Sequence, residues 1–183
     1  MINGHTITLL RHACVLDEHA TTKDVGLSDI GIQQTKSLDG HYQLVLCSKL
    51  KRAVQTLQYS NITYDKIIYT QLLREHMLDK MDLFETEDES FLETPETDQE
   101  LLFRIGRLKK LLRDLLNGLK TPINVLLVGH SDFFYNATLR KVDVGRGQIE
   151  EFGRWLCYAE QLKLVSEVDS PEGVYDLNTF LEN

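Results

Sequence analysis

The chain is poor in cysteine and has no motif that would pair its cysteines or load them with metal. Its three cysteines, Cys14, Cys47 and Cys157, lie far apart and form no Cys-x-x-Cys pair. Disulfide frameworks and zinc sites need cysteines at paired spacings, and an odd number of scattered ones is typical of reduced thiols. The histidines likewise lack the His-Glu-x-x-His spacing of a zinc site. We therefore expect neither a disulfide scaffold nor a metal centre.

Long apolar runs are also missing. No segment approaches the roughly 18 consecutive apolar residues that a membrane-spanning helix requires. The first ten residues contain no basic stretch followed by an apolar segment, which is the pattern of a secretory signal. We therefore expect a cytoplasmic protein that has no membrane partner.

Positive charge is scarce. The chain has 20 Lys and Arg residues against 28 Asp and Glu residues, which gives a net charge of -8. Binding to nucleic acid or to an anionic membrane depends on a basic face, so neither partner is expected. If the ligand is an anion, a small local pocket must attract it. The oligomeric state leaves no trace in the sequence.

Only three prolines interrupt the 183 residues, and no repeat or low-complexity block divides them. A chain of this length buries about two-thirds of its unfolded surface around a single core. We therefore expect one domain over residues 1–183.

Short apolar runs alternate with segments of helical periodicity. The runs, which are typical of strands covered on both faces, are Ile7–Leu10, Leu44–Leu46, Ile67–Tyr69 and Val125–Val128. Helical spacing extends over residues 28–38, over residues 49–59, and from Asp98 to a stop at Gly118 and Pro122. Strands that alternate with helices predict βαβ units. The expected class is α/β, a three-layer α/β/α sandwich with a mostly parallel central sheet.

Two acidic segments depart from this alternation. Residues 79–98 are crowded with carboxylates, and we predict a surface excursion there because the segment is too polar for the core. Residues 166–183 form a second acidic stretch, a C-terminal tail with a few apolar positions.

Polar side chains with phosphate chemistry follow the predicted strands. Arg11 and His12 come after the first, Arg52 lies just beyond the second, and Glu75 and His130 follow the third and fourth. Ligands of parallel sheets bind at the carboxyl ends of the strands, so we expect these five side chains to converge. An imidazole can attack phosphorus, guanidinium groups can hold phosphoryl oxygens, and a carboxylic acid can protonate a leaving oxygen.

Six sequence elements resemble those of the histidine phosphatase superfamily, the phosphoglycerate mutase-like proteins of branch 1. They are Leu10-Arg11-His12-Ala13 (Arg-His-Gly), residues 27–34 (Leu-Thr-x-x-Gly-x-x-Gln), residues 48–56 (Ser-x-Leu-x-Arg-Ala-x-Gln-Thr), Leu73-Arg74-Glu75 (Leu-x-Glu), Glu96-Thr97 with Arg104 (Glu-Ser…Arg), and Val128-Gly129-His130-Ser131. Their order and separations also match, and the resemblance extends along almost the whole chain. It implies the phosphoglycerate mutase-like fold.

The resemblance also implies a role for each of the five side chains. His12 would be the nucleophile that forms a phosphohistidine, and Glu75 would be the proton donor. Arg11, Arg52 and His130 would bind the phosphoryl oxygens, with His130 part of the catalytic set. The implied function is a phosphomonoesterase that acts on a small phosphorylated substrate without cofactor or metal.

Two other functions stay open. A phosphoglycerate mutase-type phosphotransferase would use the same residues, although the chain is short for such a mutase. A catalytically weak module that binds phosphate or phosphopeptides is favoured by two departures from the family pattern. Ala13 replaces the usual glycine, and the Thr and Asn expected downstream of it are not evident in residues 14–20.

The residues around the site also carry expectations. Ser48 and Gln55 are expected to shape their turn and helix and not to react, and Arg74 to be a surface charge. In the family's architecture the acidic segment 79–98 would lie near the mouth of the pocket. There it would discriminate against polyanionic substrates.

Overall fold

The computed structural model describes residues 5–16, 21–145 and 148–164 of the chain. Its main sheet has five strands in the order β3-β2-β4-β1-β7. They are β1 (Thr6–Arg11), β2 (Asp39–Ser48), β3 (Asn61–Thr70), β4 (Asn124–Gly129) and β7 (Gln161–Leu164). The first four run parallel, and β7 pairs antiparallel with β1 at one edge. The prediction of an α/β protein with a mostly parallel sheet is confirmed.

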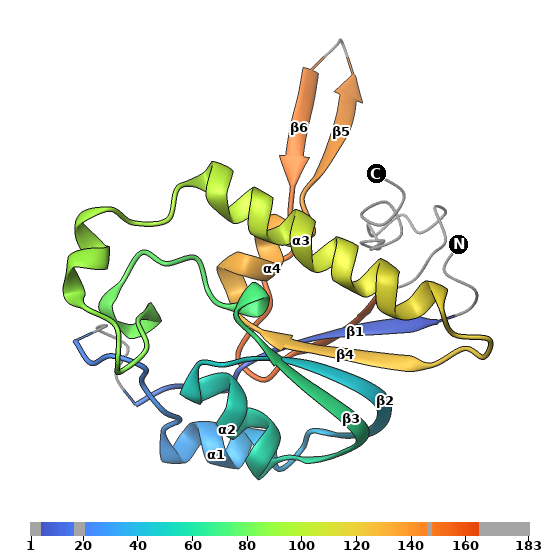
Figure 1. Cartoon of the computed structure of the whole chain (residues 1–183), viewed down its shortest axis with the longest axis horizontal. Helices are drawn as coiled ribbons and strands as arrows, with labels where there is room; N and C mark the ends of the chain where they lie inside the picture. The colour runs from blue at the N-terminus through green and yellow to red at the C-terminus, as the bar shows by residue number, and fades with distance from the viewer. Residues whose placement is uncertain (1–4, 17–20, 146–147, 165–183) are drawn as a thin grey trace.

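Helices cover both faces of this sheet, as a three-layer sandwich requires (Figure 1). The helices α1 (Asp29–Thr35) and α2 (Lys51–Tyr59) lie on one face, and α3 (Asp98–Asn117) and α4 (Ser131–Ala137) lie on the other. Side chains of a strand alternate between faces. In β2, Leu44 and Leu46 pack in one core cluster with α3, whereas Val45 and Cys47 pack in a second cluster with α2. The two clusters are the two interlayer cores.

Local signals fix where the helices begin. The Ser28 hydroxyl accepts a hydrogen bond from the Gly31 amide and caps α1, and Thr97 and Glu100 form a capping box at the start of α3. One side of α3 is buried at helical spacing by Leu101, Ile105, Leu108, Leu112 and Leu116. Among the residues that the structure describes, no helix is long and apolar enough to cross a membrane.

The acidic segment 79–98 is more ordered and more buried than predicted. It follows the 3₁₀ turn η1 (Gln71–Leu73) and contains two more, η2 (Lys80–Asp82) and η3 (Glu89–Glu93). Asp82 is only 4% exposed and Leu83 is fully buried. The prediction of a segment too polar to enter the core was therefore wrong at these two residues. Asp82 is buried because an arginine pairs with it, as described below.

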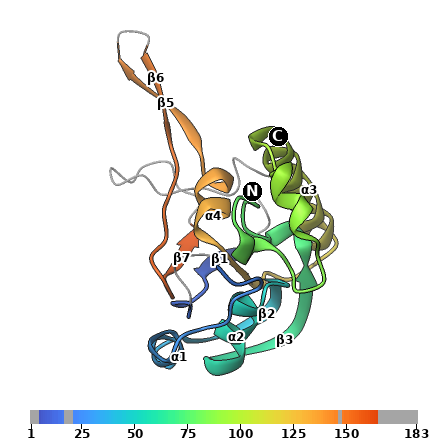
Figure 2. The same cartoon turned by 90° about the vertical axis from the view of Figure 1, so that its left-hand side faces the viewer.

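Several short elements were not predicted. They are α4, the strands β5 (Arg140–Gly145) and β6 (Gln148–Phe152), and β7. The strands β5 and β6 form a separate antiparallel hairpin that projects from the layered body (Figure 2). The three strands have no apolar run like those of β1 and β4, and α4 has no capping side chain like Ser28 of α1. The predicted acidic tail, residues 166–183, lies outside the described residues.

Helix α1 holds the chain that follows β1. The Cys14 carbonyl accepts hydrogen bonds from the amide and hydroxyl of Ser28, at 3.0 and 3.3 Å, and the Cys14 amide donates to Gln34 at 2.9 Å. Gly31 lies against the same carbonyl, and a Cβ atom at this position would come within 2.0 Å of it. The close approach of α1 to the loop after β1 thus depends on a residue without a side chain.

We predict that Gly31→Ala destabilises the protein by about 1–3 kcal/mol, because the Cys14 backbone must move away from α1. The matched control is Gly106→Ala in α3, where an added Cβ meets nothing within 4 Å. There alanine should stabilise the exposed helix by up to about 1 kcal/mol. Urea unfolding of both variants measures the difference. If Gly31→Ala and Gly106→Ala have the same free energy of unfolding, the close contact between Gly31 and the Cys14 carbonyl does not limit the size of the residue at position 31.

Candidate active site

The register of two parallel strands brings the two predicted histidines together. Arg11 is paired with Gly129 at the ends of β1 and β4, so His12 and His130 leave neighbouring strands at the same edge. The His12 amide donates to the Gly129 carbonyl at 3.0 Å, and the imidazole centroids are 5.0 Å apart. The expected convergence at the carboxyl edge of the sheet is therefore present for these side chains.

His12 is held in one tautomer. Its Nδ1 lies 2.8 Å from the Ala13 carbonyl, which can only accept, so Nδ1 carries the proton and Nε2 keeps its lone pair. Burial lowers the pKa of His12 well below its usual value, and the Arg52 charge lowers it further. The imidazole is thus neutral at physiological pH, and its basic nitrogen is Nε2.

His130 is fully buried and is also held in one tautomer. The Arg52 Nε donates to its Nδ1 at 3.3 Å, and its Nε2 lies 2.9 Å from the Ser48 hydroxyl. Because a guanidinium only donates, Nδ1 is the acceptor and Nε2–H points to Ser48. Burial and the Arg52 charge lower the pKa of His130 well below its usual value. Ser48 therefore orients a histidine, a role that was not predicted, and its hydroxyl also accepts from the Leu50 amide at 3.3 Å in the turn that it was expected to shape.

Arg52, in the first turn of α2, is 1% exposed and forms a buried ion pair. Its NH1 donates to the Met81 carbonyl at 2.6 Å, and its NH2 donates to Asp82 Oδ1 at 2.7 Å. The acidic segment 79–98 therefore contributes a residue to the site, because its Asp82 forms an ion pair with Arg52, one of the two predicted phosphate-binding arginines. Nothing in the sequence singles out Asp82 among the carboxylates of this segment.

Glu75 lies between the end of η1 and helix α4. Its Oε1 accepts hydrogen bonds from the amide of its neighbour His76, at 3.1 Å, and from the amide of Phe133 in α4, at 2.9 Å. Burial raises the pKa of Glu75 to about 7, and the nearby Asp82 charge contributes to the shift. A carboxylic acid of this pKa can both give and take a proton near neutral pH.

Arg11 lies beside an aromatic ring that the sequence reasoning missed. The Arg11 guanidinium is 4.0 Å from the centroid of the Tyr158 ring, and the same ring is 5.6 Å from His12. NH1 donates to the Leu156 carbonyl at 2.9 Å, whereas the buried Nε has no acceptor among the described residues. A buried N–H without a partner costs free energy, so this edge of Arg11 favours an added anion. Tyr158 precedes β7, which no sequence signal revealed.

Arg104, in α3, supports the backbone of the segment that carries Glu75. Arg104 donates to the Arg74 carbonyl at 2.6 Å and to the Glu75 carbonyl at 3.2 Å, and it forms a bidentate ion pair with Glu96. His76 adds a further brace, since its ring nitrogens lie 2.9 Å from an Asp132 carboxylate oxygen and 2.8 Å from the Glu96 carbonyl. These contacts fix the acid-bearing segment between α3 and α4.

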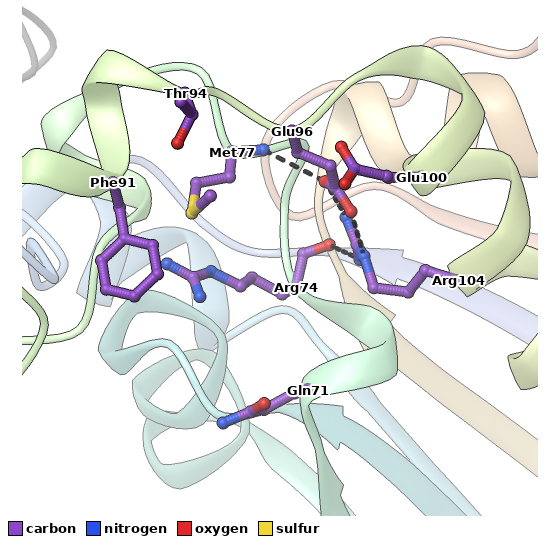
Figure 3. A pocket seen from close by; sticks show the side chains of 8 residues that line it. All are labelled: Gln71, Arg74, Met77, Phe91, Thr94, Glu96, Glu100 and Arg104. Atoms are coloured by element: carbon purple, nitrogen blue, oxygen red, sulfur yellow. Dashed lines mark hydrogen bonds and ion pairs between the residues drawn. The ribbon is translucent and has the colours of Figure 1, made fainter.

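The Arg74 side chain is not the surface charge that was predicted. It is partly buried, forms a bidentate ion pair with Glu87 and donates to the Asp82 carbonyl. It also borders a cavity of about 360 Å³ beside the acid-bearing segment, shown in Figure 3. The cavity is lined by Gln71, Arg74, Met77, Phe91, Thr94, Glu96, Glu100 and Arg104. None of the five predicted site residues lines it.

The described residues contain no group of three or more His, Cys, Asp or Glu side chains placed to hold a metal ion. The polar groups at the sheet edge are instead two neutral imidazoles, two guanidiniums and carboxyl groups. Such a set is suited to bind an oxyanion and to attack it with an imidazole nitrogen.

Known proteins share this arrangement of strands and helices. TTHB049 from Thermus thermophilus is 19% identical with a TM-score of 0.56, over 91% of this chain and 94% of that one. Phosphoglycerate mutase from the same organism is 18% identical with a TM-score of 0.50, over 91% of this chain and 94% of that one. Phosphoserine phosphatase from Entamoeba histolytica, in complex with 3-phosphoglyceric acid, is 17% identical with a TM-score of 0.52, over 73% of this chain and 77% of that one. A search of curated proteins found no match.

Likeness at these identities shows a common fold and nothing finer. The match to a family model is more specific, because it spans residues 7–152 and so includes all five predicted site residues. The model describes the histidine phosphatase superfamily (branch 1). With the fold, this match shows that the chain belongs to the histidine phosphatase superfamily, branch 1.

Proposed function

We propose that the protein is a phosphomonoesterase that hydrolyses a small phosphorylated substrate through a phosphohistidine at His12. The observation that carries the proposal is the state of His12. Its imidazole is buried and neutral, with Nδ1 bonded to the Ala13 carbonyl and Nε2 as the only nitrogen with a lone pair. It lies next to His130, and the positive charges of Arg52 and Arg11 act on it. A neutral nitrogen among fixed positive charges is the arrangement that attack on an anionic phosphoryl group needs.

In the first step, the lone pair of His12 Nε2 forms a bond to phosphorus as the bond from phosphorus to the leaving oxygen breaks. Glu75 gives its proton to that oxygen, so the product leaves as an alcohol. In the second step, a water molecule attacks the phosphohistidine and gives a proton to the Glu75 carboxylate. The phosphorus–nitrogen bond breaks, inorganic phosphate leaves, and His12 and Glu75 regain their starting states.

The phosphoryl charge would be balanced by the groups at the sheet edge. Arg11 Nε is a buried donor that needs an acceptor, and the His130 ring and the Arg52 charge act on His12 from close by. Fixed donors in a buried site stabilise the developing charge of the transition state more strongly than water does. In the proposed mechanism the alcohol part of the substrate contacts only Glu75, through its leaving oxygen, so these groups recognise the phosphoryl group.

We predict that His12→Ala lowers p-nitrophenyl phosphate hydrolysis by at least about 1,000-fold, because the nucleophile is lost. The variant should also fail to form the acid-labile phosphoprotein that rapid quenching of the wild type traps. His41→Ala is a suitable control, since His41 is exposed on β2 and its ring contacts Thr63 and Asp65 at the surface. It should retain wild-type activity.

Hydrolysis that survives in His12→Ala would refute the phosphohistidine pathway. Incubation of the wild type with 3-phosphoglycerate, with and without a bisphosphate primer, separates a hydrolase from a mutase. A hydrolase releases phosphate in both cases, whereas a mutase returns the phosphoryl group to an isomer of the substrate.

We further predict that kcat/KM falls above pH 7. Glu75 must be protonated to act as the acid, and its folded-state pKa is raised to about 7, so the active form is lost as pH rises through that value. His12 is neutral throughout this range because its pKa is lowered. Above the pKa the rate should drop about tenfold per pH unit.

Glu75→Gln should remove this alkaline limb and lower kcat by about 10²–10⁴-fold for a substrate with an alkyl leaving group. The decrease in kcat should be smaller for p-nitrophenyl phosphate, because its leaving oxygen needs little protonation. A wild-type profile that stays flat from pH 6 to pH 9 on an alkyl phosphate would exclude Glu75 as the acid.

A further inference from the structure

The buried ion pair between Arg52 and Asp82 limits what else Arg52 can bind. Each of the three guanidinium nitrogens already donates to a protein acceptor, namely His130 Nδ1, the Met81 carbonyl and Asp82 Oδ1. The two side chains of the ion pair are 2% and 5% exposed. Almost none of the guanidinium surface is therefore open to a phosphoryl oxygen unless one of these acceptors leaves.

The Asp82 carboxylate is fixed from both of its oxygens. While Oδ1 faces Arg52, Oδ2 accepts from the amides of Asp79, at 3.1 Å, and Leu78, at 3.4 Å. Asp79 and Asp82 also form the capping box that opens η2. The carboxylate thus belongs to the short turn of residues 78–83, and this turn delivers it to Arg52.

Among the three acceptors of Arg52, Asp82 is the one that an incoming phosphoryl group would repel. The Met81 carbonyl and the His130 ring are neutral, whereas Asp82 carries the same sign of charge as phosphate. Two anions against one guanidinium in a buried site repel each other strongly, because the effective dielectric constant there is low. A phosphoryl group and the Asp82 carboxylate are therefore alternative partners of Arg52.

We propose that Asp82 competes with the substrate's phosphoryl group for Arg52 and so sets how tightly the site binds phosphate. A phosphoryl group that binds Arg52 takes the position of the carboxylate, and the Asp82 side chain turns away from Arg52 and from the amides of Leu78 and Asp79 that hold it. This inference rests on the proposed function, because it requires phosphate to bind at the His12 site. The competition also determines what a tightly bound substrate needs. Displacement of Asp82 weakens the binding of every phosphoryl ligand by the same amount, so a substrate that binds tightly must add contacts from its leaving group.

The wild-type protein provides a first test through hydrogen exchange with inorganic phosphate as the probe. The Asp79 amide donates to Asp82 Oδ2 and should exchange several-fold faster at saturating phosphate, because its acceptor moves away. The Ala13 amide, which donates to Thr56 beside His12, should be unchanged or slower. Slower exchange at Asp79, or no change there while phosphate binds, would overturn the proposal.

Asp82→Asn provides the second test, since asparagine keeps an oxygen for Arg52 and removes the charge. The variant should bind inorganic phosphate about tenfold more tightly than the wild type in calorimetric titrations. The matched control is Glu85→Gln, which removes the same charge from an exposed side chain of the same segment, paired with Lys51. Its affinity should stay within about twofold of the wild type. Equal or weaker phosphate binding by folded Asp82→Asn contradicts the competition.

The variant also leaves Arg52 without a buried counterion, which destabilises the fold. If phosphate replaces Asp82, phosphate should raise the melting temperature of Asp82→Asn more than that of the wild type. An equal rise in both proteins contradicts the proposal. Should the variant fail to fold even with phosphate, hydrogen exchange in the wild type decides the question.

These measurements are separable from the test of the proposed reaction. A wild-type protein that hydrolyses phosphomonoesters but shows no competition keeps the proposed function and loses the role of Asp82. A protein that shows the competition but forms no phosphohistidine keeps the role of Asp82 and loses the reaction. Absence of phosphate binding in both the wild type and folded Asp82→Asn removes the role of Asp82, whatever turnover shows.

Discussion

A guanidinium that is 1% exposed must be surrounded by acceptors, and the groups around Arg52 follow from this requirement. Burial lowers the pKa of both His12 and His130 and the Arg52 charge lowers it further, which keeps the two imidazoles neutral. The counterion of Arg52, Asp82, is drawn into the interior and in turn helps to raise the pKa of Glu75. One buried charge thus helps to set the protonation of the proposed nucleophile, and its counterion helps to set that of the proposed acid.

The backbone around this charge is held by contacts that leave little room for change. Strand register fixes the distance between the two histidines, and Gly31 lets α1 reach the carbonyl of Cys14, two residues after His12. On the other side, Arg104 bonds to the carbonyls of Arg74 and Glu75 and so places the acid. His12 and Glu75 are therefore both positioned through main-chain atoms of their own segments, which explains how short loops can hold these two side chains in place.

The parts of the molecule that follow from local signals could be predicted from the sequence. The four parallel strands, the starts of α1 and α3, and the proximity of His12 and His130 rest on apolar periodicity, capping residues and sheet geometry. Asp82 could not be found in this way. It is one of many carboxylates in residues 79–98, and only the tertiary path of η2 distinguishes it from its exposed neighbours. Tyr158 was missed for a similar reason, because the four residues of β7 that follow it carry no clear pattern.

Arg11 and Arg52 both lie close to the end of a predicted strand, but different groups surround their guanidiniums. Arg11 is flanked by a carbonyl and the face of Tyr158, which attract its charge without neutralising it, and its buried Nε still needs an acceptor. Arg52 is neutralised by Asp82 and has all of its nitrogens engaged. Among the described residues no carboxylate forms an ion pair with Arg11, so an anion that binds there displaces none, whereas contact with Arg52 requires an exchange of partners. Arg11, at the end of β1, is thus not neutralised by Asp82, whereas Arg52 in α2 can bind an anion only after it releases Asp82. The difference between the two arginines is the Asp82 carboxylate at the end of η2.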